Sequence, residues 1–218
     1  QARCNQKMSP VKQKGGKLSV KKPEHKVRIV GGMWKRTPLA VADVDGLRPT
    51  SERVRETLFN WLVHLRGNGF GRMNCLDLFA GTGALGFEAA SRGLAHVTMI
   101  EENGTACAQL QVIKKKLNAV QVSIYCADAL KFSGQLARTD RKFDLIFLDP
   151  PFQKDLLPRV LPLCVRLLAS KGLVYVESNE AVTNEKLRFW MEDSVPGLQI
   201  IREGRAGQVY YHLLEMKA

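Results

Sequence analysis

The chain has 218 residues, of which 45% are hydrophobic and 25% charged, values that are ordinary for a globular protein with one sizeable core. No run approaches the roughly 20 apolar residues that a membrane-spanning helix needs, so we expect no membrane partner. The five cysteines form no CxxC pair, which argues against a metal site or a disulfide framework and favours a reducing, cytoplasmic location. They are Cys4, Cys75, Cys107, Cys126 and Cys164.

The net charge of +12 is concentrated at the beginning of the chain. Residues 1–36 carry 11 Lys or Arg and one acid, Glu24, whereas residues 37–218 carry 22 Lys or Arg and 20 acids. Such a polycation suits a nucleic-acid phosphate backbone, because binding releases counterions. A solubilising tail is the alternative for residues 1–22, and a membrane surface is a weaker one, since no apolar face is present. We predict a basic flexible tail over residues 1–26.

Residues 27–66 predict a short hairpin followed by a helix, which together form an N-terminal extension. Residues 27–30 and 33–41 flank two glycines that would supply the turn. Thr50 is the expected N-cap of a helix that runs to about Arg66, with Arg53, Arg55 and Glu56 lying off its apolar stripe. That stripe is formed by Val54, Leu58, Trp61, Leu62 and Leu65. Candidate RNA contacts in this extension are Arg28, Trp34, Lys35, Arg36 and Arg48.

From residue 73 the hydrophobic pattern alternates between strands and helices. Strands are expected at 75–79, 96–100, 122–126, 143–148 and 173–176, with helices up to residue 91 and over 105–117. An antiparallel pair over 198–202 and 208–214 would close the sheet. This alternation predicts an α/β domain over residues 67–218, with a mainly parallel sheet covered by helices on both faces. Ligands of such sheets bind beyond the carboxyl ends of the strands.

A glycine-rich turn follows the first of these strands. Residues 81–86 match GxGxxG between a strand and a helix, where glycines let the backbone approach a nucleotide-type ligand. Glu101 stands 20 residues after Gly81 and ends the next strand, where its carboxylate could bind two ribose hydroxyls. This much leaves NAD and S-adenosylmethionine both open. A turn needed only for packing is the alternative interpretation.

Two acidic residues favour S-adenosylmethionine. Asp77 lies inside the strand four residues before Gly81, where it could meet the cationic methionine portion. Asp128 ends the third strand and could accept a hydrogen bond from the adenine amino group. A helix or turn cap is the alternative role for this residue. A dehydrogenase would also give no role to the basic front end or to the segment described next.

The segment Asp149-Pro150-Pro151-Phe152 closes a buried strand with a carboxylate, two prolines and an aromatic ring. The prolines fix their φ angles and donate no N–H group, so the neighbouring carbonyls are held in a rigid arrangement. Asp149 adds acceptors, and Phe152 offers a face on which a base can stack. These features suit a flat, amine-bearing base, whereas a rigid loop without a ligand is the plainer alternative.

These motifs together resemble a class I methyltransferase that acts on exocyclic amines. Three further segments resemble the RsmD family, the bacterial small-subunit rRNA guanine-N2 methyltransferases. They are residues 27–32, residues 46–60 and residues 207–210, and the resemblance spans about residues 27–215. Family members often carry an acid where this chain has Asn103.

The resemblance implies a Rossmann-like, seven-stranded sheet, S-adenosylmethionine as methyl donor, and one guanine of 16S rRNA, usually numbered 966, as acceptor. The RNA would be free or part of an assembling small ribosomal subunit, and the protein a monomer. Catalysis is implied at Asp149, Pro150, Pro151 and Phe152. Implied cofactor contacts are Thr50, Asp77, Phe79, Ala80, Gly81, Thr82, Gly83, Gly86, Glu101, Asp128 and Ala129.

Three other functions stay open at this point. An amine methyltransferase acting on adenine N6 or on a protein glutamine would use a similar acid or amide, prolines and aromatic ring. A non-catalytic RNA-binding or ribosome-assembly factor on the same fold would predict a damaged cofactor site. An NAD-dependent reductase is the most distant, and a cofactor-binding titration would distinguish it.

Overall fold

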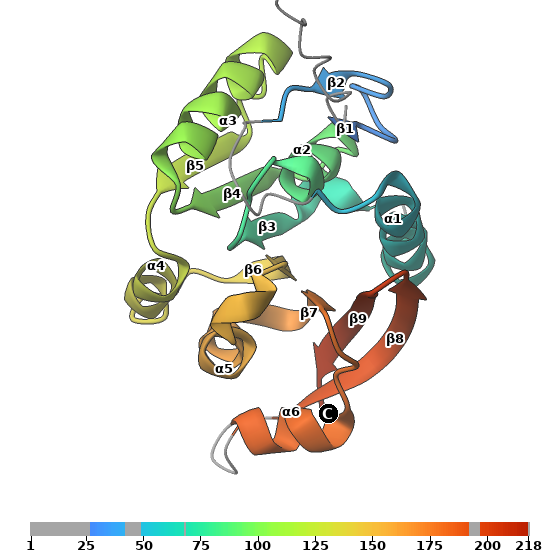
Figure 1. The fold of residues 1–218 in the computed structure, drawn as a ribbon, viewed down its shortest axis with the longest axis vertical. Helices are drawn as coiled ribbons and strands as arrows, with labels where there is room; N and C mark the ends of the chain where they lie inside the picture. Colours follow the sequence, from blue (N-terminus) through green and yellow to red (C-terminus); the bar gives the residue numbers. More distant parts are fainter. Residues whose placement is uncertain (1–26, 42–48, 68, 192–196, 218) are drawn as a thin grey trace, which may run out of the picture.

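The computed structural model describes residues 27–41, 49–67, 69–191 and 197–217, and these build a seven-stranded sheet in the order β5-β4-β3-β6-β7-β9-β8. The five strands from β5 to β7 are parallel, and β9 is antiparallel to both of its neighbours (Figure 1). This confirms the predicted mainly parallel sheet with a closing antiparallel pair. The strands are β3 (Asn74–Asp77), β4 (His96–Glu101), β5 (Val122–Cys126), β6 (Phe143–Leu148), β7 (Leu168–Ser178), β8 (Leu198–Ala206) and β9 (Val209–Met216).

Helices cover both faces of the sheet, as predicted (Figure 1). One face carries α1 (Glu52–Arg66), α2 (Ala84–Ser91) and α3 (Gly104–Leu117). The other carries α4 (Ala129–Leu136), α5 (Leu157–Leu167) and α6 (Asn184–Met191), which the sequence analysis did not identify. Two 3₁₀ turns, η1 (Phe70–Arg72) and η2 (Phe152–Lys154), complete the described elements. No helix in the described ranges is long and apolar enough to cross a membrane.

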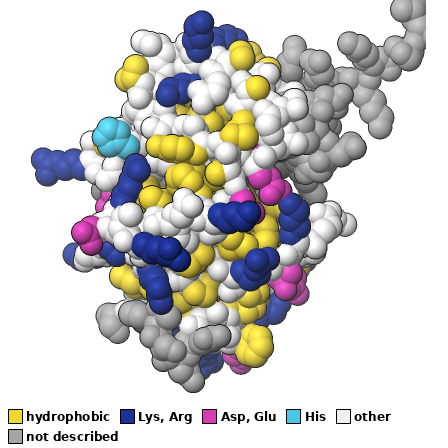
Figure 2. Space-filling view, turned by 90° about the vertical axis from the view of Figure 1, so that its left-hand side faces the viewer, with side chains coloured by type: hydrophobic (Ala, Val, Ile, Leu, Met, Phe, Trp, Pro, Cys, Tyr) yellow, Lys and Arg dark blue, Asp and Glu magenta, His cyan; other side chains and the backbone are white. Residues whose placement is uncertain are grey.

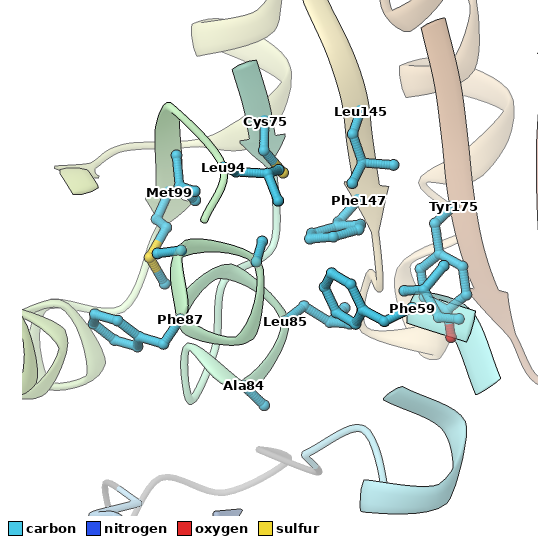
Figure 3. Packing of buried hydrophobic residues seen from close by; sticks show 14 of the residues in the cluster. Phe59, Cys75, Ala84, Leu85, Phe87, Leu94, Met99, Leu145, Phe147 and Tyr175 are labelled. Carbon is cyan, nitrogen blue, oxygen red and sulfur yellow. The ribbon is translucent and has the colours of Figure 1, made fainter. Parts of the chain in front are cut away.

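Aromatic rings join α1 to the sheet (Figure 3). The ring of Phe59 packs edge-on against Phe147 with centroids 6.4 Å apart, and Phe147 packs in the same way against Tyr175 at 6.0 Å. All three side chains are fully buried, so α1 contributes to the main core rather than resting on its surface. The division between an extension ending at residue 66 and a separate catalytic domain stays a prediction.

The predicted hairpin is confirmed as β1 (Val27–Arg28) paired antiparallel with β2 (Pro38–Leu39). Its connection lies on α2, where Met33 and Trp34 donate backbone hydrogen bonds to the carbonyl and hydroxyl of Ser91 at 2.8 and 2.9 Å. Gly32 has φ +76°, and a Cβ there would stand 1.9 Å from the Ser91 carbonyl oxygen. Glycine is therefore required at this position by both its dihedral angle and the close approach.

Two predictions about α1 are wrong. The N-cap is Ser51, whose hydroxyl accepts from the Val54 amide at 3.3 Å, because the Thr50 hydroxyl is directed to acidic side chains of the sheet. Arg55, expected off the apolar stripe, is fully buried and forms an ion pair with the equally buried Glu88 at 3.1 Å. A charged residue can occupy a buried helix face when a partner on another element neutralises it.

Candidate functional site

A cavity of about 1140 Å³ opens at the carboxyl ends of the parallel strands. It lies around β3 and β6, which is the point where the strand order reverses and where ligands of open α/β sheets bind. Thirteen of the fifteen predicted cofactor and catalytic residues line it. They are Thr50, Asp77, Phe79, Ala80, Gly81, Thr82, Glu101, Asp128, Ala129, Asp149, Pro150, Pro151 and Phe152.

The two predicted residues missing from this lining are Gly83 and Gly86. A Cβ at Gly83, which has φ +78°, would stand 2.6 Å from side-chain atoms of Leu110 and Phe87. A Cβ at Gly86 would stand 2.9 Å from Met99 of β4. The packing interpretation therefore applies to these two glycines, while Gly81 faces the cavity.

Glu101 is held in place by two backbone amides. Its Oε2 accepts from Gly81 N and its Oε1 from Asn103 N, both at 2.8 Å. A carboxylate offers about four acceptor sites, so these bonds fix its orientation and leave capacity for hydroxyl donors. Asn103 itself caps α3 by accepting from Ala106 N at 3.0 Å, a role that Asn fills as well as Asp.

Asp77 is a buried carboxyl group at the bottom of the cavity. Burial raises its pKa from 3.8 to about 7, and the backbone amides of Phe79 and Gly86 act in the opposite direction. Neither carboxylate oxygen has a hydrogen bond of ordinary geometry within the described part of the chain. A buried ionisable group in this condition is suited to a cationic ligand that would ionise it.

Asp128 begins the next helix. Its Oδ1 accepts from Lys131 N at 2.8 Å, so it is the N-cap of α4, and it also lines the cavity. The alternative role of Asp128, as a helix cap, is therefore present. The side chain is exposed at the rim, where the cap fixes its position without removing it from the cavity.

At the other end of the cavity, Thr50 connects two carboxylates. Its hydroxyl lies 2.8 Å from Glu177 Oε1 and 3.3 Å from Asp149 Oδ2, and Tyr175 Oη donates to the same Glu177 oxygen at 2.9 Å. Burial, and then Glu177, hold the pKa of Tyr175 above its usual value, so it stays a donor. A hydroxyl has one proton, and the shorter distance assigns it to Glu177.

Glu177 is a site residue that was not predicted from the sequence. It is 3% exposed, lines the cavity and ends the parallel run of β7 beside Asp149. The rule that selected acids at the ends of the other strands applies equally to this position. That rule could have identified it.

The four predicted RNA contacts that the structure describes do not line the cavity. Arg28 pairs with Glu52 at 3.3 Å, Trp34 is half-buried, and Lys35 and Arg36 are exposed on the hairpin. Arg48 lies outside the described residues. The cations that do line the cavity are Lys131, Lys154 and Arg159.

Lys154 and Glu102 form an ion pair across the mouth of the cavity. The hydrogen bond from this ammonium to the carboxylate raises the pKa of Lys154. Lys154 belongs to the turn that begins at Phe152, and Glu102 follows Glu101, so the pair joins the two halves of the site.

Known proteins share this arrangement over most of the chain. The family model described as Conserved hypothetical protein 95 matches residues 27–215. The chain belongs to this family. A family relative, "Ribosomal RNA small subunit methyltransferase D" of Escherichia coli strain K12, is 38% identical over 209 residues, which cover 91% of this chain and 96% of the relative. The resemblance to the RsmD family is thus confirmed.

Solved structures agree with the family assignment. The yhhF protein of Escherichia coli matches with a TM-score of 0.72 at 37% identity, covering 88% of this chain and 99% of that one. The SAM-dependent methyltransferase from Agrobacterium tumefaciens matches with a TM-score of 0.60 at 18% identity, covering 80% of this chain and 69% of that one. The second likeness shows the fold, which is the Rossmann-like methyltransferase fold that the sequence predicted.

Proposed function

We propose that this chain transfers a methyl group from S-adenosylmethionine to the exocyclic N2 of one guanine in 16S rRNA. The observation that carries the proposal is a single cavity that joins two chemically different halves. One half has the glycine turn, Asp77 and Glu101, and the other has Asp149, the two prolines and Phe152. The relative named small-subunit rRNA methyltransferase D supports this substrate class.

The first half fits S-adenosylmethionine, which when bound supplies an electrophilic methyl group on a cationic sulfur. Asp77 would pair with the ammonium of the methionine portion, and Glu101 would accept from the ribose hydroxyls. Gly81 lets the backbone come close to the ligand. Asp128, at the rim, would accept from the adenine amino group.

The second half would hold the guanine after it leaves its own stack. Phe152 would stack on the base, while Asp149 and the Pro150 carbonyl would each accept one hydrogen bond from the N2 amine. Two acceptors would aim the nitrogen lone pair at the methyl group, and positioning of this kind supplies much of the rate of a displacement. Asp149 would then take the proton that the methylated amine releases.

Binding of S-adenosylmethionine is expected to strengthen about tenfold between pH 6 and pH 8, because a carboxyl with a pKa of about 7 ionises over that interval. Titration calorimetry in buffers of different ionisation enthalpy should detect the released proton. Asp77→Asn should bind more weakly at pH 8 and lose most of this pH dependence. An unchanged profile in Asp77→Asn would show that another group is responsible.

The same carboxyl group links folding to pH. Its folded-state pKa, about 7, exceeds the unfolded value of 3.8, so its contribution to the free energy of unfolding is present below pH 3.8 and is lost as the pH rises toward 7. Asp77→Asn should remove this decrease from chemical-denaturation curves of the ligand-free protein. The Asn variant therefore has a folding readout that is independent of activity.

The function is tested by methyl transfer from labelled S-adenosylmethionine to unmodified 16S rRNA, free and in partly assembled small-subunit particles. Nucleoside mass analysis should find N2-methylguanosine at the position the family numbers 966. A methyl group on adenine N6 would support the competing amine methyltransferase. RNA binding with neither cofactor binding nor methyl transfer would support a non-catalytic assembly factor. We also propose a cytoplasmic monomer, which sedimentation and cell fractionation would test.

A further inference from the structure

We infer that a basic face formed by α3, β5 and α4 binds the rRNA strand that flanks the target guanine. This basic face is formed by residues 104–142. The inference rests on the proposed function, because it describes how the proposed RNA substrate is held. Figure 2 looks at this side of the molecule and shows Lys and Arg side chains distributed around a strip of hydrophobic ones. The hairpin residues predicted from sequence lie elsewhere, on α2.

Outside residues 1–36, positive charge is concentrated in the segment that forms this face. Residues 104–142 hold seven Lys or Arg and two acids, Asp128 and Asp140. The rest of the region after residue 36 holds 15 Lys or Arg against 18 acids. The excess positive charge of residues 37–218 therefore belongs to the segment that forms this face, as expected for a phosphate-binding surface.

The lysines on this face are available to a ligand. Lys115 and Lys116, in the last turn of α3, and Lys131, in the first turn of α4, are exposed. None of these three takes part in an ion pair with another described residue. Lysines at a helix C-terminus also favour the helix dipole, but that accounts for the α3 lysines only and not for Lys131 in a first turn.

The same segment also exposes aromatic and apolar side chains. Tyr125, on the edge strand β5, is 42% exposed and its ring packs against Phe132 of α4 with centroids 5.0 Å apart. Val112 and Val120 nearby in the sequence are 60% and 81% exposed. Exposed rings among basic side chains are the combination on which single-stranded bases stack.

The basic face is continuous with the cavity at Lys131. Lys131 lines the cavity and stands next to Phe132, which packs on Tyr125. A strand that delivers its guanine to Phe152 can therefore continue past Lys131 onto the Tyr125 surface. Phosphates of the nearest nucleotides would then meet Lys131. Phosphates farther along the strand would meet Lys115 and Lys116, which lie at the other end of this face, where β5 begins.

A second copy of the chain is the competing occupant, because β5 is an edge strand with only one neighbour. In a two-fold dimer each copy presents the same patch to the other. Two faces with a large excess of Lys and Arg would then be brought together. Charge thus favours a polyanion over self-association.

The decisive variant is Lys115→Glu/Lys116→Glu. Its dissociation constant for unmodified 16S rRNA, measured by filter binding at several KCl concentrations, should rise about tenfold or more at low salt. The slope of log K against log salt should fall by roughly 1.4, since each lost single-strand phosphate contact removes about 0.7. S-adenosylmethionine affinity should stay unchanged in calorimetry, because neither lysine lines the cavity.

The matched control is Arg188→Glu/Lys217→Glu, which makes the same charge change on exposed residues of α6 and of the segment after β9, near the opposite edge of the sheet. It should weaken RNA binding less than threefold. If both variants weakened RNA binding equally, the loss would be due to the change in net charge alone, and the inference would be wrong. Tyr125→Ala should weaken binding about fivefold or more, while Tyr125→Phe should restore it, because stacking needs only the ring.

Two outcomes separate this inference from the proposed function. If the unaltered chain methylates 16S rRNA and Lys115→Glu/Lys116→Glu binds as tightly as it does, the function stands and the face is wrong. If the unaltered chain neither binds nor methylates 16S rRNA, both proposals fail. A wild-type dimer in sedimentation that becomes monomeric in the double variant would assign the face to a second copy instead.

Discussion

Asp149→Ala is expected to reduce the rate of methyl transfer by about 100-fold or more, while the affinity for S-adenosylmethionine changes less than about threefold. In the proposed mechanism the variant would lose a hydrogen bond from the target amine to a charged acceptor, worth about 1.5–3 kcal/mol, and with it the alignment of the nitrogen lone pair. Single-turnover transfer to unmodified 16S rRNA measures the chemical step directly. Calorimetry measures the affinity for S-adenosylmethionine, which depends on the other half of the cavity.

Asp149→Asn is the matched control, because the amide keeps the size of the side chain and one carbonyl acceptor. Its rate should fall between those of the wild type and Asp149→Ala.

Thr50→Val should lower the rate of methyl transfer while both carboxylates remain, since Thr50 Oγ1 lies 3.3 Å from Asp149 Oδ2 and 2.8 Å from Glu177 Oε1. Wild-type turnover in Asp149→Ala would disprove the role assigned to Asp149.

The parallel core and most of the cavity lining were predictable, because their signals are local. Continuous apolar runs bounded by turn residues identify β3 to β6, and a functional side chain at the end of such a run must lie at one edge of the sheet. Asp77, Glu101, Asp128 and Asp149 were located in this way, and all four line the cavity. The position of Glu177 obeys the same rule but was not used.

The features that escaped prediction depend on partners far away in the sequence. Arg55 is charged, and no neighbouring residue in the sequence indicates that Glu88, 33 residues later, is buried beside it. Thr50 and Ser51 are adjacent hydroxyl residues, and only the bond from Thr50 to Glu177, 127 residues away, decides which of them is left to cap α1. Gly83 and Gly86 look like ligand contacts until Leu110 and Met99 are packed against them.

The buried pair of Arg55 and Glu88 connects the hairpin, α1 and α2. Glu88 accepts from Val30 N, Gly31 N and Arg92 Nε at 2.7–2.8 Å in addition to Arg55. Arg55 also donates to the Arg28 carbonyl at 2.8 Å and to the Thr50 carbonyl at 3.2 Å. Both side chains are fully inaccessible to solvent. Arg55 without Glu88 would be an uncompensated buried charge, whereas Glu88 without Arg55 would keep only its ion pair with Arg92.

Arg55→Met is therefore expected to lower the free energy of unfolding by about 3–5 kcal/mol, because it removes one of the two cations paired with the buried Glu88 and also the donors to the Arg28 and Thr50 carbonyls. For a chain of this size that corresponds to a decrease in Tm of about 6–20 °C, which calorimetry or circular dichroism will measure. Removing the exposed pair through Arg28→Ala should cost less than about 1 kcal/mol, since Arg28 and Glu52 are 58% and 48% exposed.

Arg55→Met/Glu88→Gln separates the charge from the hydrogen bonds. The amide oxygen of Gln can still accept from Val30 N or Gly31 N, and no unpaired carboxylate remains, so the double variant should regain part of the lost stability. A loss below about 1 kcal/mol in Arg55→Met would show that water or a neighbouring cation compensates Glu88. Because Arg55 also holds the Thr50 carbonyl, and Thr50 contacts Asp149, the single variant should transfer methyl groups more slowly even at temperatures where it is folded. Stability and catalysis would then depend on the same buried guanidinium.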